Sequence, residues 1–346
     1  MKMLKSVLTA GFGVATGATF FLPAEWADNI WFNILRVAIM LIFIGLMLSY
    51  KINHRLAESV KKAPRSAQIL MILIPVVVLV FVLIQVLWPE FAVWLVRCDN
   101  HTTCGLNFRH AIFVKAAFEL VAVVIFVTLA LKFVKKKQLW PSLVLVLLAL
   151  VTLLLAGEEL SWGQRIFEWA TPAAFAKINA QGETNLHNLA TQLFQNTWYF
   201  GGWLLLVALP FFREPLAKFF KRFKRFAFVA DFLPPTYFLL IFAAAYGLVD
   251  PIIASTGVHF GSILFSILGT AAILVYLIIP ARGKLAERLC LSLGVFVIAL
   301  FFNLLVSQVW SQASGVPTEY LELFIAFGIM WWAIDLRQRL SMKKKE

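Results

Sequence analysis

Long, mostly apolar runs dominate this sequence and restrict what the chain can fold into. Among them are residues 69–87, 143–156 and 289–302. Hydrophobic residues fill 61% of the 346 positions and charged residues 14%, whereas a soluble domain is nearer half apolar and a quarter charged. A water-soluble core does not need so many apolar side chains. The sequence therefore predicts an integral membrane protein with many spans.

The apolar runs, separated by charged breaks, predict an all-α bundle of ten transmembrane helices in a single domain covering residues 1–346. A helix needs about 20 residues to cross the hydrocarbon core of a bilayer. The predicted spans lie near 6–22, 30–50, 67–88, 110–134, 139–156, 197–212, 227–248, 260–280, 289–310 and 319–336.

The basic residues are distributed unevenly between alternate loops of this bundle. Of the 31 Lys and Arg residues, 25 fall on one side, and short basic loops stay in the cytoplasm. Both termini are therefore predicted to be cytoplasmic, in the inner membrane of a bacterium. The net charge of +13 is then a topology signal, and membrane lipids rather than nucleic acid are the expected partners.

Two features outside the central spans leave alternatives open. Residues 6–22 follow a charged start and resemble a signal peptide, but they lack a small-x-small cleavage site and are rich in glycine, which favours a retained helix. Cys98 and Cys104 flank a short loop on the outer side. They either form a disulfide in an oxidising compartment or remain free thiols.

The longest outer segment, residues 157–196, carries most of the unusual polar residues. It also holds too many apolar residues for a freely solvated loop, so we expect two short helices at the interface or folded back into the bundle. Thr171 and Pro172 are typical of a helix start, and Gly182 of a helix end.

Glu158 and Glu159 close an apolar span and are the first candidate catalytic residues. Carboxylates near bilayer depth are costly and need a partner or a purpose, and a poorly solvated carboxylate can act as a general acid or base. Neighbouring helical positions point about 100° apart, so one side chain is expected to face the bundle and the other the rim. Ser161, Gln164 and Arg165 follow at helical spacing as candidate substrate-binding residues. The alternative is that the glutamates only mark the membrane boundary.

His187 is the third candidate catalytic residue, because histidine can relay a proton or bind a metal. Its neighbours Asn185 and Asn188 can orient it or donate to an anionic group. A lone histidine near an interface is also common as a boundary residue, and this alternative stays open.

Further polar residues are predicted on the same face. His259 opens the eighth span, and Glu319 and Glu322 share one face at the start of the last span. We expect the two glutamates either to pair with Arg165 or to join His187 and His259 around a divalent metal. Short His-x-x-His spacing, which would favour a metal, is absent from the sequence.

Three classes of function follow from this distribution. The preferred hypothesis is a membrane-embedded hydrolase or transferase that acts on a lipid or lipid-linked substrate at the outer face. The second is a transporter or flippase, supported by Lys115 and Glu119 inside the fourth span, although these two residues are expected to pair with each other. The third is a noncatalytic membrane scaffold with an acidic outer surface.

Overall fold

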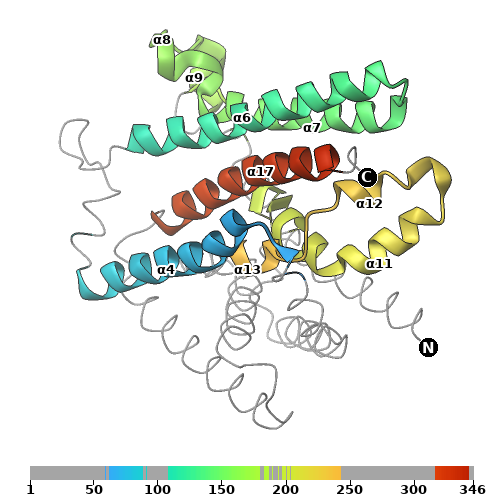
Figure 1. Cartoon of the computed structure of the whole chain (residues 1–346). Coiled ribbons are helices and arrows are strands. Elements are labelled where there is room, and N and C mark those ends of the chain that lie inside the picture. The colour runs from blue at the N-terminus through green and yellow to red at the C-terminus, as the bar shows by residue number, and fades with distance from the viewer. Residues whose placement is uncertain are drawn as a thin grey trace, which may run out of the picture. The chain divides into compact units, whose positions relative to one another are not determined.

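Every regular element in the described part of the chain is a helix, as expected (Figure 1). The computed structural model describes residues 62–88, 108–179, 204–242 and 316–342, with shorter stretches at 59, 91, 183–186, 189, 194, 197–199 and 201–202. The predicted spans at 6–22, 30–50, 260–280 and 289–310, and both outer cysteines, lie outside these residues. The chain divides into two compact units, Met1–Gly105 with Pro235–Leu321 and Leu106–Pro234 with Glu322–Glu346.

In the first unit, helix α4 (Arg65–Leu87) packs against helix α13 (Phe238–Phe242). Pro64 precedes α4, and the Gln68 side-chain amide donates to the Ala63 carbonyl at 3.1 Å. Both helices carry buried apolar side chains, among them Ala67, Ile74, Ile241 and Phe242.

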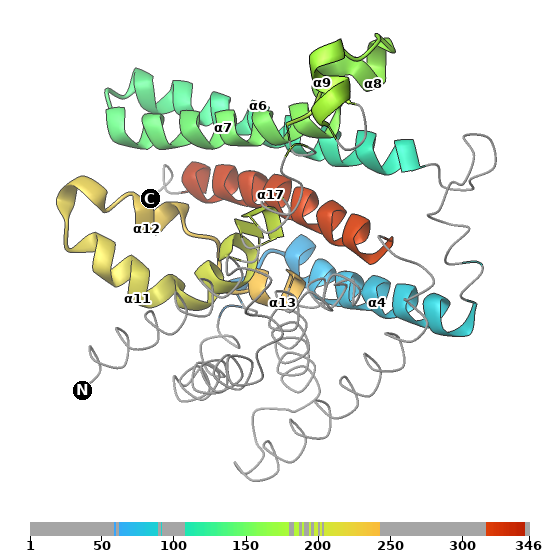
Figure 2. The same ribbon diagram turned by 180° about the vertical axis from the view of Figure 1, so that it is seen from behind.

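An antiparallel hairpin of α6 (Phe108–Lys135) and α7 (Leu139–Glu159) forms the centre of the second unit (Figures 1 and 2). Lys137 adopts a φ of 57° in the short turn, and the Ser142 hydroxyl donates to the Ala130 carbonyl at 3.1 Å. Within the described residues, Ile112–Lys135 and Leu139–Glu159 are the two helices long and apolar enough to cross a membrane. Both coincide with predicted spans.

Helix α17 (Val316–Met342) contributes Glu322 and the residues after it to the second unit. Its Trp332 ring meets Phe126 of α6 edge to face, with centroids 5.5 Å apart. The Trp332 indole N–H also donates to the Phe232 carbonyl at 2.9 Å. Arg339 pairs with Asp335 at 2.6 Å and donates to the Asp231 carbonyl.

One predicted span runs past its expected end, and another is broken where its prolines predict a break. The 197–212 span continues beyond its predicted end, because a π-helical turn, η5 (Leu204–Ala208), leads into α11 (Leu209–Lys221). The 227–248 span is interrupted at its two adjacent prolines, as the sequence predicts, and α12 (Val229–Phe232) ends before Pro234. Proline lacks a backbone N–H and disfavours helix in the residue before it, so the Pro234–Pro235 step separates α12 from α13.

Candidate functional site

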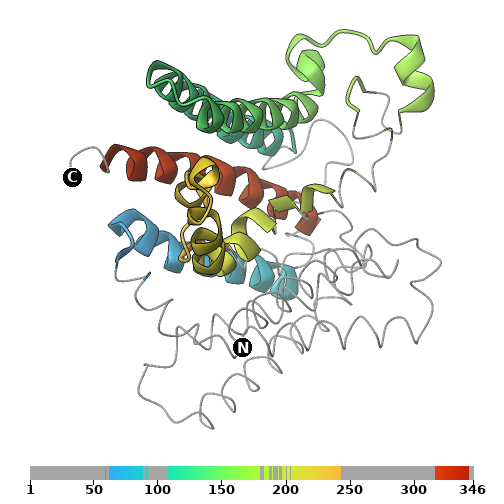
Figure 3. The ribbon, with the colours of Figure 1, turned by 90° about the vertical axis from the view of Figure 1, so that its right-hand side faces the viewer.

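The segment that follows α7 folds over one end of the hairpin (Figure 3). It contains a 3₁₀ turn, η3 (Ser161–Gly163), and two short helices, α8 (Gln164–Phe167) and α9 (Ala173–Ile178). Helix α9 begins directly after Pro172, close to the predicted start. It ends at Ile178 rather than near Gly182, because Asn179 is already extended, with φ −88° and ψ 126°.

The turn after α7 has a strained backbone and packs the Trp162 ring against Gly157. Ser161 and Trp162 have φ values of 47° and 54°, in the left-handed region, and Gly163 has 97°. The Trp162 ring lies over Gly157, where a Cβ atom would meet ring carbons at 2.9 Å. Non-glycine residues with positive φ cost free energy that surrounding contacts must offset, and they concentrate at functional sites.

Glu158 supplies two of the contacts that hold this turn. One carboxylate oxygen accepts the Trp162 indole N–H at 2.7 Å, and the other accepts the Leu186 backbone N–H at 2.7 Å. The side chain is buried. Glu158 therefore connects the end of α7 to both the turn and the backbone at Leu186, where the segment returns.

A buried polar network surrounds Ser161, whose hydroxyl donates to Glu183 Oε2 at 2.9 Å. Arg165 donates to the same carboxylate oxygen at 2.7 Å and to the Ser161 hydroxyl at 3.2 Å. Asn185 makes the same pair of contacts, at 2.7 and 3.2 Å. Ser161 and Asn185 are fully buried.

Further hydrogen bonds extend the network along the segment. Gln164 accepts from the Thr184 backbone N–H at 2.8 Å and donates to the Thr171 hydroxyl at 2.6 Å. The Asn179 amide donates to the Asn185 carbonyl and side-chain oxygens at 2.8 and 2.9 Å. We define the loop network as Glu158, Ser161, Trp162, Gln164, Arg165, Thr171, Asn179, Glu183, Thr184, Asn185 and Leu186.

Four of the predicted substrate-binding residues, Ser161, Gln164, Arg165 and Asn185, thus lie together in the loop network. The expected pairing of Arg165 with Glu319 or Glu322 is wrong, because the Arg165 ion pair is formed with Glu183, at 2.7 Å. Glu183 lies only 18 residues after Arg165, in a segment that folds back on itself, whereas Glu319 and Glu322 belong to a helix distant in the sequence.

A second group of charges lies on the hairpin and on α17. The Lys115 ammonium lies 2.9 Å from Glu159 Oε2 and 2.7 Å from Glu322 Oε2. The Tyr199 hydroxyl donates to the other Glu322 oxygen at 2.9 Å. Lys115 and Glu119, which the sequence predicts as a pair, interact electrostatically, although no hydrogen bond joins them. The closest contacts of the Lys115 ammonium that the structure gives are with the carboxylates of α7 and α17.

Glu119 completes this group, which we call the Lys115 cluster (Lys115, Glu119, Glu159, Tyr199 and Glu322). It follows Lys115 by one helical turn on the same face of α6 and lies within electrostatic range of Glu159 and Glu322. Lys115 and Glu119 are only 2% and 1% exposed. Neither carboxylate oxygen of Glu119 accepts a hydrogen bond from the part of the chain that the structure describes.

The remaining predicted site residues are His187, Asn188 and His259, which lie outside the described residues, and Glu319, whose side chain is not described. Within the described residues, no three His, Cys, Asp or Glu side chains are grouped so that they could hold a metal ion.

Several residues of these two groups were not predicted as site residues, among them Glu183, Asn179 and Tyr199. Glu183 is the sole acidic residue between positions 169 and 196, so a search for the partner of Arg165 within its own segment would have found it. Asn179 and Tyr199 carry no comparable sequence signal, because their roles depend on how the chain returns. No protein family, curated protein or solved structure matches the chain.

Proposed function

We propose that the chain is a ten-span membrane enzyme, a hydrolase or transferase, that acts on a lipid or lipid-linked substrate. The two apolar helices of the hairpin and the uneven distribution of basic residues support the membrane topology. By the positive-inside rule, the α6–α7 turn faces the cytoplasm. The loop network and the Lys115 cluster then lie toward the exterior, which is the periplasm in a bacterial inner membrane.

The main support for the enzymatic proposal is that Glu159 and Glu322 both form ion pairs with the Lys115 ammonium. Ionisable side chains within a membrane segment are costly and mark functional sites by default. The three residues come from three different helices, and Tyr199 extends the chain of contacts. Such an arrangement provides a proton acceptor, a fixed positive charge and a hydroxyl donor within a few ångströms.

Glu159 is the proposed general base. Both oxygens of Glu158 already accept hydrogen bonds within the loop network, whereas the Glu159 side chain is 19% exposed. Glu159 would take a proton from water or from a substrate hydroxyl, and Lys115 would stabilise the developing negative charge. Glu322 and Tyr199 would hold Lys115 in place.

The other predicted residues are assigned according to their contacts. Arg165 and Asn185, proposed from the sequence as anion-binding groups, hold the loop segment through Glu183. His187 remains the proposed proton relay, because it follows Leu186, whose backbone N–H binds Glu158.

A lipid substrate is supported by the apolar surface beside the loop network. Phe167 is 70% exposed, and its ring stacks on Trp169 at 5.5 Å. Ile166 and Ile178 are also exposed. Exposed aliphatic and aromatic side chains on short helices are typical of segments lying in a membrane interface, where a lipid-linked substrate would approach Glu159.

Lipid profiling of a deletion strain tests this function. Expression of the wild-type chain should reverse an accumulated or missing lipid, and Glu159→Gln should fail to reverse it at equal membrane abundance. Glu168→Gln is the matched control, because Glu168 is an exposed carboxylate of the same segment. An unchanged lipid profile in the deletion strain, or full activity of Glu159→Gln, would contradict the proposal.

A transporter or flippase is the second candidate, and Glu119 favours it. Glu119 lies seven residues inside the apolar stretch Ile112–Lys135, about 10 Å along the helix axis. Transporters place polar groups at such depth. Purified protein in liposomes separates the two functions, because an enzyme changes the covalent structure of a lipid, whereas a flippase moves an unmodified fluorescent lipid between leaflets and requires Glu119.

A further inference from the structure

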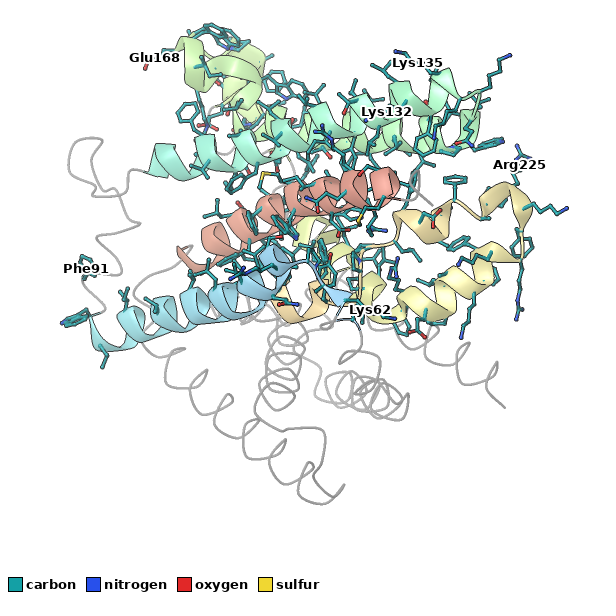
Figure 4. All side chains as sticks on the ribbon, viewed as in Figure 1. Lys62, Phe91, Lys132, Lys135, Glu168 and Arg225 are labelled. Carbon is teal, nitrogen blue, oxygen red and sulfur yellow. The ribbon has the colours of Figure 1, made fainter. Side chains whose placement is uncertain are left out.

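A basic and aromatic surface lies at the end of the hairpin away from the loop network. The α6–α7 turn meets the segment after α11, because the Arg225 guanidinium lies 3.9 Å from the centroid of the Trp140 ring. Figure 4 shows Lys135 and Arg225 toward this end and Glu168 toward the other. Two loops far apart in the sequence therefore form one surface.

The charge of this surface has one sign. Residues 131–140 and 216–230 contain no Asp or Glu. All their basic side chains are exposed; we define the basic patch as Lys132, Lys135, Lys136, Lys137, Lys218, Lys221, Arg222, Lys224 and Arg225. Like charges at this density repel one another, so an anionic partner would stabilise the surface.

Exposed aromatic rings lie among these cations. Phe219, Phe223 and Phe226 are all exposed, and Phe219 contacts Phe223 edge to face at 5.3 Å. Trp140, under Arg225, is exposed as well. A soluble phosphate compound would use the cations alone. Apolar rings combined with cations match the boundary between acyl chains and anionic head groups.

Arg225 is oriented to bind a phosphate group. One face of its guanidinium covers Trp140, which fixes the plane of the group and leaves its edge of N–H donors available. Such an edge binds two phosphate oxygens at once. Within the described residues, no carboxylate forms an ion pair with Arg225.

We propose that this surface binds the head group of an anionic phospholipid of the adjacent leaflet, with Arg225, stacked on Trp140, as the central phosphate contact. The neighbouring lysines add long-range attraction, and the exposed phenylalanines enter the acyl region. The binding site is separate from the Lys115 cluster, so it stands even where no enzymatic activity is found.

Native mass spectrometry of the full chain, released from nanodiscs that mix phosphatidylcholine and phosphatidylglycerol, tests the binding. The released protein should retain phosphatidylglycerol in preference to phosphatidylcholine. Arg225→Gln should lower this preference about fivefold, the effect of one cation at a lipid surface. The matched control is Lys177→Gln, which removes an exposed cation of α9 and should leave the preference unchanged.

A further pair of variants tests the role of the stacked ring. In a Trp140→Leu background, Arg225→Gln should have a much smaller effect, because the guanidinium is no longer fixed. Gel filtration and circular dichroism verify that each variant is folded. Equal retention of the two lipids by the wild type, an unaltered preference in Arg225→Gln, or the same loss in Lys177→Gln would each overturn the proposal.

Discussion

Glu158 and Glu159 are adjacent at the end of α7, yet their carboxylates bind different parts of the second unit. Glu158 accepts from Trp162 and Leu186 in the loop network, while Glu159 lies against Lys115 of α6. Successive residues of a helix point about 100° apart, which places the two side chains on different faces. The two groups of polar residues are therefore joined through a single peptide unit.

Substitution of each glutamate should affect a different region. In Glu158→Gln, the new amide N–H₂ group faces either the Leu186 backbone N–H or the Trp162 indole N–H, and two donors cannot form a hydrogen bond. The unsatisfied donor should lower the free energy of unfolding by about 1–3 kcal/mol. Hydrogen exchange of residues 160–186 should accelerate in Glu158→Gln and remain unchanged in Glu159→Gln. Equal acceleration in both variants would show that the two side chains do not act separately.

Removal of the Lys115 charge should be strongly destabilising. Lys115→Met leaves Glu159 and Glu322 without their shared cation, and a broken buried ion pair costs about 3–5 kcal/mol. Thermal unfolding of the purified protein in detergent measures the loss. Glu322→Gln in the same chain should recover part of it, because one uncompensated charge is then absent. A Lys115→Met variant as stable as the wild type would be inconsistent with the cluster.

Gly157→Ala should disturb the turn after α7. The new Cβ atom meets the Trp162 ring at 2.9 Å, and overpacking of this kind typically costs about 1–3 kcal/mol. The matched control is Gly201→Ala, because a Cβ atom at Gly201 meets nothing within 4 Å. Trp162→Ala should suppress the effect of Gly157→Ala. If the losses of stability were additive in the double variant, the Cβ atom at position 157 would not clash with the Trp162 ring.

Trp331 and Trp332 provide a matched pair on α17. Trp332→Phe removes a buried hydrogen bond to the Phe232 carbonyl and should cost about 1–3 kcal/mol. The Trp331 indole N–H is buried without a partner among the described residues. Trp331→Phe should therefore cost less, because it removes an unsatisfied donor. Thermal unfolding compares the two variants, and the reverse order would contradict these contacts.

The helices of the hairpin could be predicted from the sequence because apolar runs bounded by Lys and Glu determine them locally. The divergence of Glu158 and Glu159 also follows from helical periodicity. The partners of Lys115 could not be predicted in this way, because Glu322 is 207 residues away and local spacing favours Glu119. The break of the 227–248 span could also be predicted, because two adjacent prolines interrupt a helix whatever apolar residues flank them.

The contacts of the loop network were also only partly predictable from the sequence, although its residues are closer together in the chain. The sequence of residues 158–165 indicated that its polar side chains belong together. Glu183, as the sole acidic residue between positions 169 and 196, was the available partner for Arg165 within the segment. The positive φ values of Ser161 and Trp162, which shape the turn before this contact, were not predicted. Backbone conformations of this kind are rare for non-glycine residues, and no local pattern predicts them.

The position of Lys115 has a consequence for the order in which the protein assembles. Lys115 is synthesised 207 residues before Glu322. An ammonium group without a counter-charge costs free energy in an apolar environment. Glu159 belongs to the same hairpin and lies 2.9 Å from Lys115 in the finished structure. The α6–α7 hairpin therefore contains a counter-charge for Lys115 as soon as both helices are synthesised. Glu322 is synthesised later and adds a second carboxylate to an ion pair that already exists.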